Sequence, residues 1–212
     1  INESELESIL DYLKGYNILK ANIWLEKAIN NKLNDNDICL TFDDGLKCQY
    51  DVALPILEKR DLTAFWFVYS NIYHGFEGRL ELYRYYRTAF FQNIDEFYNS
   101  FFEFFFHFIL SNNVINKLKD ININNYLYEF EFYTFNDRKF RYTRDKILGP
   151  KDYFYIMDQI IESHNIDIDN VKKHLWIDEK SLKKLVLKDH IIGLHSYSHP
   201  TEISSLTKCE QR

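Results

Sequence analysis

The sequence lacks several features that would assign it to a special class of protein. It has three cysteines among 212 residues, an odd number without paired spacing, so no disulfide framework is indicated and reduced thiols in an intracellular compartment are expected. No apolar run reaches the roughly 18–20 residues needed to cross a bilayer. The densest run, residues 101–110, is interrupted by Glu103 and His107. Repeats and low-complexity linkers are also missing.

An excess of positive charge is absent as well. The formal net charge is -6, whereas nucleic-acid-binding domains carry a basic stripe, so no nucleic-acid partner is expected. Hydrophobic residues make up 46% of the chain and charged residues 27%, which is typical of globular proteins. The length suffices for one sizeable core, or for a core with an insertion.

The first chemically informative stretch is an apolar run that ends in two acids. A buried strand is predicted over residues 38–42, followed directly by Asp43, Asp44 and a glycine. An amphipathic helix comes next, and then a second strand is predicted over residues 62–68. Strand, helix and strand within about 30 residues indicate a right-handed parallel unit.

A similar arrangement is found near the other end of the sequence. A helix capped by Asp178 or Ser181 is predicted to precede a short strand, residues 191–194, which leads into His195 and His199. Because the carboxyl ends of parallel strands meet at one edge, the acids and the imidazoles are expected to lie close together. One carboxylate with two histidines is a ligand set that leaves positions open on a divalent metal, as hydrolytic sites require.

Each of these motifs alone has a common structural explanation. An Asp-Asp-Gly sequence is usually a turn, and two histidines four residues apart are more often helix caps or surface residues. Because both motifs occur at the ends of apolar strands, a metal site is favoured over these structural explanations. The remaining histidines lack a partner at ligand spacing and are expected in structural or surface positions; they are His74, His107, His164, His174 and His190.

The two motifs resemble those of the polysaccharide deacetylase family, the NodB-like carbohydrate esterases of family 4. Residues 41–45 match the first motif of that family, Thr-Phe-Asp-Asp-Gly, letter for letter, and residues 195–199 match the second, His-[Ser/Thr]-x-x-His. The resemblance extends over about residues 38–72 and 174–207. It implies an α/β fold, a partial distorted (β/α) barrel of the NodB type. The residues between the two matching stretches, which the resemblance does not cover, are expected to form a large aromatic-rich helical insertion.

The resemblance also implies roles for individual residues. By motif position Asp43 would be the catalytic base. The ligands of one divalent metal ion, with zinc as the metal expected, would be Asp44, His195 and His199. Ser196 would steady the histidine loop. The metal would polarise an acetyl carbonyl, and Asp43 would accept the proton of the attacking water.

The chain is expected to divide into three parts. Residues 1–36 form an N-terminal helical segment, residues 37–72 and 174–212 form part of the barrel, and residues 73–173 form an inserted subdomain. Within the insertion, residues 126–142 alternate aromatic and charged side chains, a pattern that predicts a β-hairpin.

The inserted subdomain is rich in aromatic residues and arginines. Its Phe and Tyr residues are expected to form a core, with a sugar-stacking lid or a homo-oligomer interface as the alternatives. Its arginines could bind an anionic group such as the diphosphate of a nucleotide sugar, although a solvated face with local ion pairs is the commoner arrangement. They are Arg84, Arg87, Arg138, Arg141 and Arg144.

The function expected from these observations is hydrolysis. The protein would be a metal-dependent hydrolase of carbon–nitrogen bonds other than peptide bonds, removing an N- or O-acetyl group from an acetylated sugar or polysaccharide in surface-glycan metabolism. A location in the cytoplasm, or at the inner face of the membrane, is expected. Two alternatives remain open: a catalytically silent subunit for glycan binding or assembly, and a metal hydrolase of another ester or amide.

Parts of the expected site have no counterpart in the sequence. The family supplies its general acid, a base-orienting arginine and its further strands from later motifs, which would lie beyond Arg212. The chain also begins at Ile1, without methionine or a signal pattern. We therefore expect it to be part of a longer protein and to show little turnover by itself.

Overall fold

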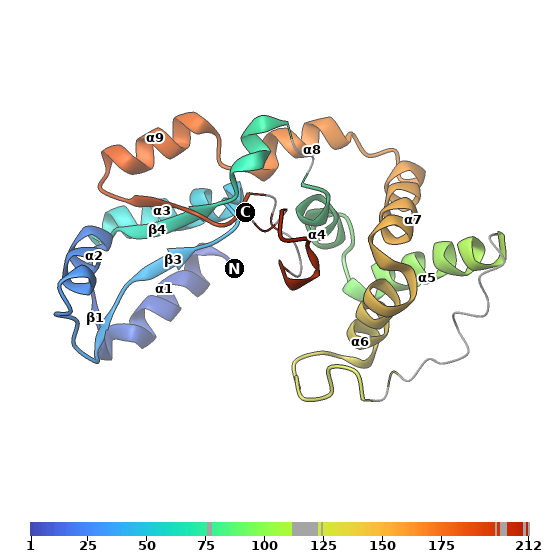
Figure 1. Ribbon diagram of the computed structural model, residues 1–212, viewed down its shortest axis with the longest axis horizontal. Coiled ribbons are helices and arrows are strands. Elements are labelled where there is room, and N and C mark those ends of the chain that lie inside the picture. Colours follow the sequence, from blue (N-terminus) through green and yellow to red (C-terminus); the bar gives the residue numbers. More distant parts are fainter. Residues whose placement is uncertain are drawn as a thin grey trace. The chain divides into compact units, whose positions relative to one another are not determined.

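Figure 1 shows the computed structural model, a mixed α/β fold with two parallel sheets. The structure describes residues 1–75, 78–111, 123, 125–197, 199, 203–209 and 211. The chain divides into two compact units, the first comprising residues 1–78 and 170–212 and the second residues 79–169.

The first unit contains both sheets. Its elements are α1 (Glu3–Tyr12), a 3₁₀ turn (Leu13–Gly15), β1 (Asn17–Ile18), α2 (Ala21–Ile29), β2 (Asp37–Ile38), β3 (Leu40–Phe42), α3 (Lys47–Lys59), β4 (Ala64–Val68), a 3₁₀ turn (Ser70–His74), α9 (Glu179–Leu187), β5 (Ile191–Leu194) and a 3₁₀ turn (Ile203–Ser205). The helix α8 (Ile168–Leu175) leads back into this unit from the second.

The larger sheet has the strand order β3-β4-β5, and both pairings are parallel. Leu40 lies opposite Ala64, and Phe65 lies opposite Ile191. The three predicted strands and their parallel arrangement are therefore confirmed, except that the first begins at Leu40 rather than Ile38, which belongs to β2 of the smaller sheet. The small parallel pair β1–β2 has no signal in the sequence, because strands of two residues show no periodicity.

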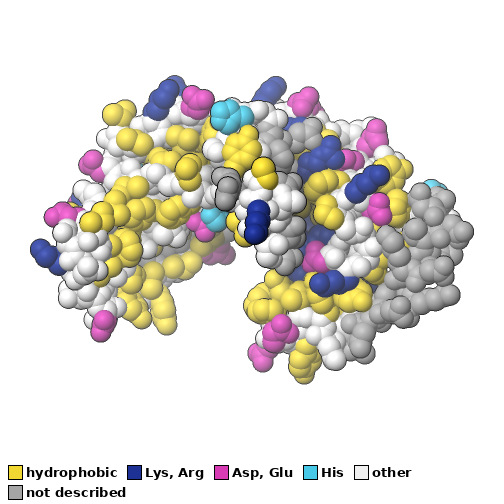
Figure 2. Space-filling view, in the orientation of Figure 1, with side chains coloured by type: hydrophobic (Ala, Val, Ile, Leu, Met, Phe, Trp, Pro, Cys, Tyr) yellow, Lys and Arg dark blue, Asp and Glu magenta, His cyan; other side chains and the backbone are white. Residues whose placement is uncertain are grey.

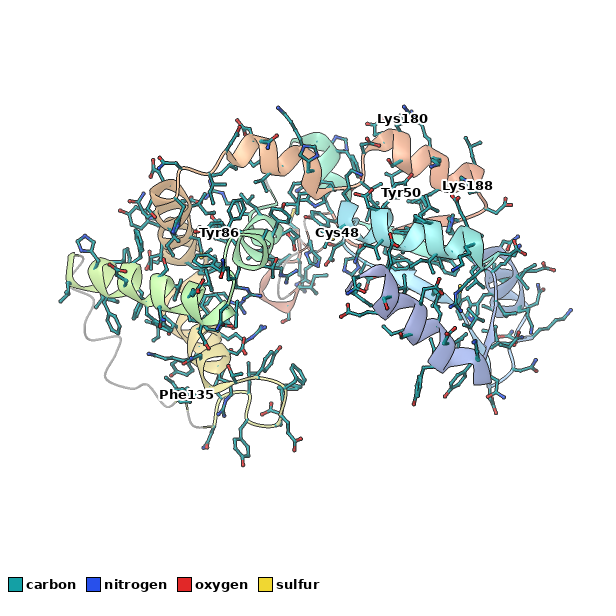
Figure 3. All side chains as sticks on the ribbon, turned by 180° about the vertical axis from the view of Figure 1, so that it is seen from behind. Cys48, Tyr50, Tyr86, Phe135, Lys180 and Lys188 are labelled. Atoms are coloured by element: carbon teal, nitrogen blue, oxygen red, sulfur yellow. The ribbon has the colours of Figure 1, made fainter. Side chains whose placement is uncertain are left out.

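One face of the larger sheet carries the core of the first unit. Alternate strand residues point to the same face, so Leu40, Trp66 and Ile192 pack with Leu57 of α3 and Leu185 of α9. Figure 3 shows from behind how α1 and α3 lie over the strands. The opposite face lines a cavity of about 390 Å³, bordered by Trp24, Asp37, Ile38, Cys39, Thr41, Phe65 and Phe67.

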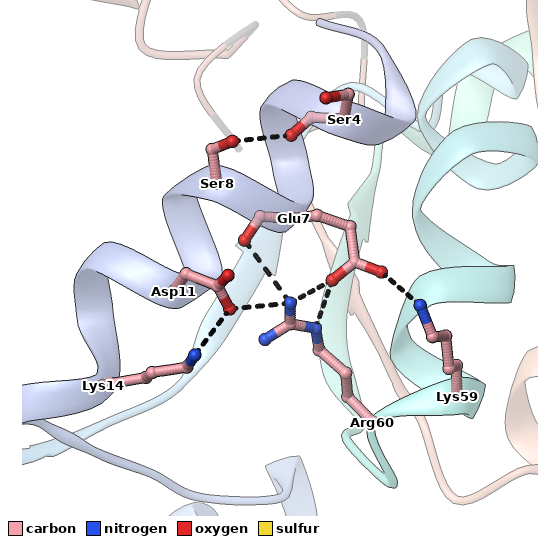
Figure 4. A network of polar contacts seen from close by, with 7 residues as sticks. All are labelled: Ser4, Glu7, Ser8, Asp11, Lys14, Lys59 and Arg60. Atoms are coloured by element: carbon pink, nitrogen blue, oxygen red, sulfur yellow. Dashed lines mark hydrogen bonds and ion pairs between the residues drawn. The ribbon is translucent and has the colours of Figure 1, made fainter.

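The helix α1 is held on α3 by apolar and charged contacts. Leu6 and Leu10 are buried in the same core. Beside them, Nε of Arg60 donates to the Glu7 carboxylate at 2.6 Å, and its guanidinium also contacts Asp11 at 2.8 Å (Figure 4). Ion pairs that remain partly open to solvent contribute little by themselves, so the buried leucines account for most of the docking energy.

The second unit is helical and has its own core. It contains α4 (Arg79–Ala89), α5 (Ile94–Ser111), α6 (Phe135–Tyr142), a π-helical segment (Thr143–Leu148) and α7 (Gly149–Ser163). Aromatic side chains dominate its buried cluster, including Tyr83, Tyr86, Phe97, Phe101 and Phe140. Among the described residues, no helix is both long enough and apolar enough to span a membrane.

The β-hairpin predicted over residues 126–142 is wrong. Residues 135–142 form α6, which begins with a reciprocal cap. The hydroxyl of Thr134 accepts from the backbone N–H of Asp137 at 3.1 Å, and the Asp137 carboxylate accepts from the N–H of Thr134 at 3.2 Å. This capping box starts a helix where the sequence pattern indicated a turn. The aromatic alternation before it lies in turns rather than strands.

A buried histidine ties the beginning of β5 to β4. The Nδ1 of His190 accepts hydrogen bonds from the N–H of Ala64 at 3.0 Å and from Nε1–H of Trp66 at 3.2 Å. Two bonds accepted at Nδ1 require a neutral ring with its proton on Nε2. Desolvation lowers the pKa of His190 from its ordinary 6.5, against the smaller opposing influence of Glu58.

This arrangement predicts a pH dependence of stability. Because folding lowers the pKa of His190, the unfolded state binds more protons, and the free energy of unfolding must fall as the pH drops below 6.5. His190→Gln keeps an acceptor that does not titrate, so its stability should fall less between about pH 7 and about pH 5.5. Urea unfolding at a series of pH values measures, for each protein, the slope of the free energy of unfolding against pH.

The exposed His174 provides the control for this measurement. His174→Gln should keep the slope of the unchanged protein. Identical slopes for His190→Gln and the unchanged protein would show that His190 does not link protonation to folding.

Candidate metal centre

The first donor, Asp44, lies in a tight turn directly after β3. Asp44 and Gly45 both have left-handed backbones, with φ of 72° and 66°. Aspartate tolerates this conformation better than most residues, and glycine adopts it freely. A Cβ on Gly45 would lie 2.9 Å from Cγ1 of Val68, so the turn can approach β4 only with glycine there. The N–H of Ile177 donates to the Gly45 carbonyl at 2.9 Å and fixes the turn.

The two histidines occupy the loop after β5. The N–H of His195 donates to the Val68 carbonyl at 2.8 Å, which continues the β4–β5 pairing by one residue. The Ser196 hydroxyl then accepts from the N–H of His199 at 3.0 Å and closes the loop. Ser196 and His199 have φ of 65° and 49°. Such backbones are uncommon outside glycine and often occur at functional sites.

These loops bring three side chains to one point. Nε2 of His195 lies 3.5 Å and Nε2 of His199 lies 3.1 Å from Oδ1 of Asp44. One ligand atom from each of the three residues lies within 4.8 Å of the others. Imidazole nitrogens and a carboxylate oxygen are ligands that zinc and related divalent ions use in sites with an open position. The donor set therefore fits a divalent metal.

Tyr69 supports one of these donors and was not identified from the sequence. It follows β4 directly and is completely buried. Its ring stacks on the His199 imidazole, with 5.2 Å between the centroids and 17° between the planes. Its hydroxyl accepts from Nε1–H of Trp176 at 2.9 Å. Only its position at the carboxyl end of a strand could have indicated a role at this site.

Asp43 differs from the three converging residues. Its side chain is exposed, and it forms no ion pair within the part of the chain that the structure describes. The histidine loop after β5, by contrast, is held by a further backbone contact, in which the N–H of Asn71 donates to the Tyr197 carbonyl at 3.1 Å. The role of Asp43 as a base therefore remains a prediction from the motif.

The stacked pair predicts how metal affinity responds to substitution. Tyr69→Leu keeps all three donors but removes the ring that orients His199, so affinity for Zn²⁺ or Co²⁺ should fall about 10- to 100-fold. Tyr69→Phe keeps the stack and should bind nearly as well as the unchanged protein. Isothermal titration measures the affinity, and the visible spectrum of bound Co²⁺ reports the geometry.

Two further variants control this experiment. His199→Ala removes a donor and should weaken binding more than Tyr69→Leu does, whereas exposed His174→Ala should leave binding unchanged. Unchanged affinity in a folded Tyr69→Leu protein would refute the orienting role of the ring.

One comparison with known proteins bears on this site. Residues 30–83 match the family model described as Polysaccharide deacetylase. The matched segment is 54 of the 212 residues; it contains β3, α3 and β4 and includes Asp43 and Asp44, but not the histidine loop. No match to a curated protein or to a solved structure was found. The family predicted from the motifs is confirmed over this segment, which is similar to polysaccharide deacetylases.

Proposed function

We propose that the protein is a metal-dependent hydrolase that removes an acetyl group from an acetylated sugar or amino sugar. The observation that carries this proposal is the convergence of Asp44, His195 and His199 at the carboxyl edge of a parallel sheet. The family match over residues 30–83 supports a glycan as the substrate class. A surface glycan bearing N- or O-acetyl groups is the substrate we propose.

The metal ligands would be Asp44, His195 and His199, and zinc is the ion we propose, because its sites combine imidazole and carboxylate donors. A divalent ion bound there would act as a Lewis acid toward the acetyl carbonyl. Three protein donors leave room for substrate, which is typical of catalytic rather than structural sites.

Asp43 would serve as the base. It precedes the metal-binding Asp44 by one residue and is exposed to solvent, so its carboxylate can reach a water molecule. Accepting a proton from that water as it attacks the carbonyl would increase the rate. Ser196 and Tyr69 would act through His199, by holding its backbone and its ring plane.

We also propose that the larger sheet is part of a distorted (β/α) barrel and that residues 73–173 are an aromatic-rich insertion in it. Three parallel strands with α3 and α9 packed on one face support the barrel. The cavity on the other face is where a barrel interior would lie. The aromatic cluster of the second unit supports an independently packed insertion.

An acetate-release assay on the full-length protein tests the reaction. With N-acetylglucosamine oligomers as substrate and Zn²⁺ bound, Asp43→Asn should lower kcat at least about 100-fold, because the variant lacks the proton acceptor. Its zinc content should not change, since Asp43 is not one of the ligands. Asp35→Asn, at another exposed aspartate, should retain full activity.

The results of this assay test the role of Asp43 and distinguish an enzyme from a silent subunit. Full activity in Asp43→Asn would exclude Asp43 as the base. A full-length protein that binds both zinc and the oligomer but releases no acetate would instead be a silent glycan-binding subunit.

A further inference from the structure

Arginines in the second unit gather around a buried aromatic ring. The guanidinium of Arg87, on α4, lies 5.7 Å from the centroid of Phe140, and that of Arg144 lies 5.9 Å from the same ring. Arg87 also lies 6.0 Å from the ring of Phe97. Arg141, on α6, lies 4.2 Å from the ring of Tyr133. Figure 2 shows Lys and Arg side chains, in dark blue, on the face that carries α4.

Two buried tyrosines show that these charges share one neighbourhood. Burial and a hydrogen bond to Asp137 raise the pKa of Tyr98, and the charges of Arg87 and Arg141 both oppose that rise. Burial raises the pKa of Tyr153 to about 12, again against Arg144 and Arg87. The ring of Phe140, which Arg87 approaches, lies 5.5 Å from that of Tyr98 and 6.2 Å from that of Tyr153, so the ring contacts place Arg87 beside both tyrosines.

Some arginines of this neighbourhood are neutralised by adjacent carboxylates. Arg84 pairs with Glu81 at 3.0 Å, and Arg144 pairs with Asp145 at 2.5 Å. Both pairs are local in sequence. Of the five arginines named in the sequence analysis, these two therefore form the local ion pairs that were expected there as the commoner arrangement.

Arg87 and Arg141 differ from these two. Neither forms an ion pair with a carboxylate of the described residues, and the Nε atom of each is buried without a hydrogen-bond acceptor there. Asp137 precedes Arg141 by one turn of α6 and already accepts from the Tyr98 hydroxyl and from Thr134. A buried charged donor without an acceptor is costly, and a bound anion would remove that cost by supplying the acceptor.

We propose that Arg87 and Arg141 form a binding site for a phosphoryl group. Two guanidinium groups without carboxylate partners supply two positive charges, which match the charge of a phosphate near neutral pH. Their planar N–H forks suit phosphate oxygens, and the buried Nε donors gain the acceptors that they lack. The aromatic rings beneath them hold the guanidinium planes in place. The site lies within the second unit and does not depend on the metal centre.

Thermal unfolding of the complete chain, with sodium phosphate compared with sodium chloride at equal ionic strength, tests this site. Phosphate should raise the Tm of the unchanged protein. Arg87→Gln and Arg141→Gln should each weaken phosphate binding about tenfold or more, because each removes a charge-assisted contact. Arg79→Gln changes a paired arginine on the same helix and should keep the full shift.

A second measurement guards against variants that simply unfold. Without phosphate, Arg87→Gln should be at least as stable as the unchanged protein, because it removes an uncompensated charge. No Tm shift in the unchanged protein, or an undiminished shift in both glutamine variants, would overturn the proposal.

Titration with uridine diphosphate alongside inorganic phosphate then distinguishes the sources of the phosphoryl group. Tighter binding of the diphosphate would assign the site to a nucleotide-linked or lipid-linked group. Equal affinities would assign it to free phosphate.

Discussion

The candidate site depends on the double pairing of β4. This strand forms parallel ladders with β3 on one side and β5 on the other, so both neighbours end at the same edge of the sheet. The Val68 carbonyl binds the N–H of His195, and the Val68 side chain leaves room only for glycine at position 45. One residue at the end of β4 thus sets the position of both loops. Antiparallel pairing would have sent the acids and the imidazoles to opposite ends.

The loops hold their donors in backbone conformations that L-residues seldom adopt. Left-handed backbones at Asp44, Ser196 and His199 each cost on the order of 1–3 kcal/mol, and they persist only where other contacts require them. Those contacts are present: Ile177 binds the turn after β3, and Ser196 binds His199. Five other described residues outside glycine are also left-handed, so the strain is not confined to the site; at the site it aims the donors toward one another.

Short-range patterns explain what could be predicted from the sequence. Apolar runs predicted the strands. The acids and histidines at the ends of these runs predicted a site, and the fold brings three of them together. Contacts between distant segments had no such signal. The stack of Tyr69 on His199 and the two hydrogen bonds accepted by His190 join residues far apart in the chain. Near Thr134 a local helix cap outweighed the strand-like alternation, because caps satisfy backbone groups directly.

The geometry at Asp44 suits a metal centre as well as a simple ion pair. Two imidazole nitrogens face a single carboxylate oxygen, and the His195 and His199 ring centroids lie 5.1 Å apart. A neutral imidazole with its proton on Nε2 can donate to the carboxylate, so hydrogen bonds account for these distances when no ion is bound. A divalent cation between the three residues would instead be bound by the lone pairs of both rings and of the carboxylate, and the same convergence serves both arrangements.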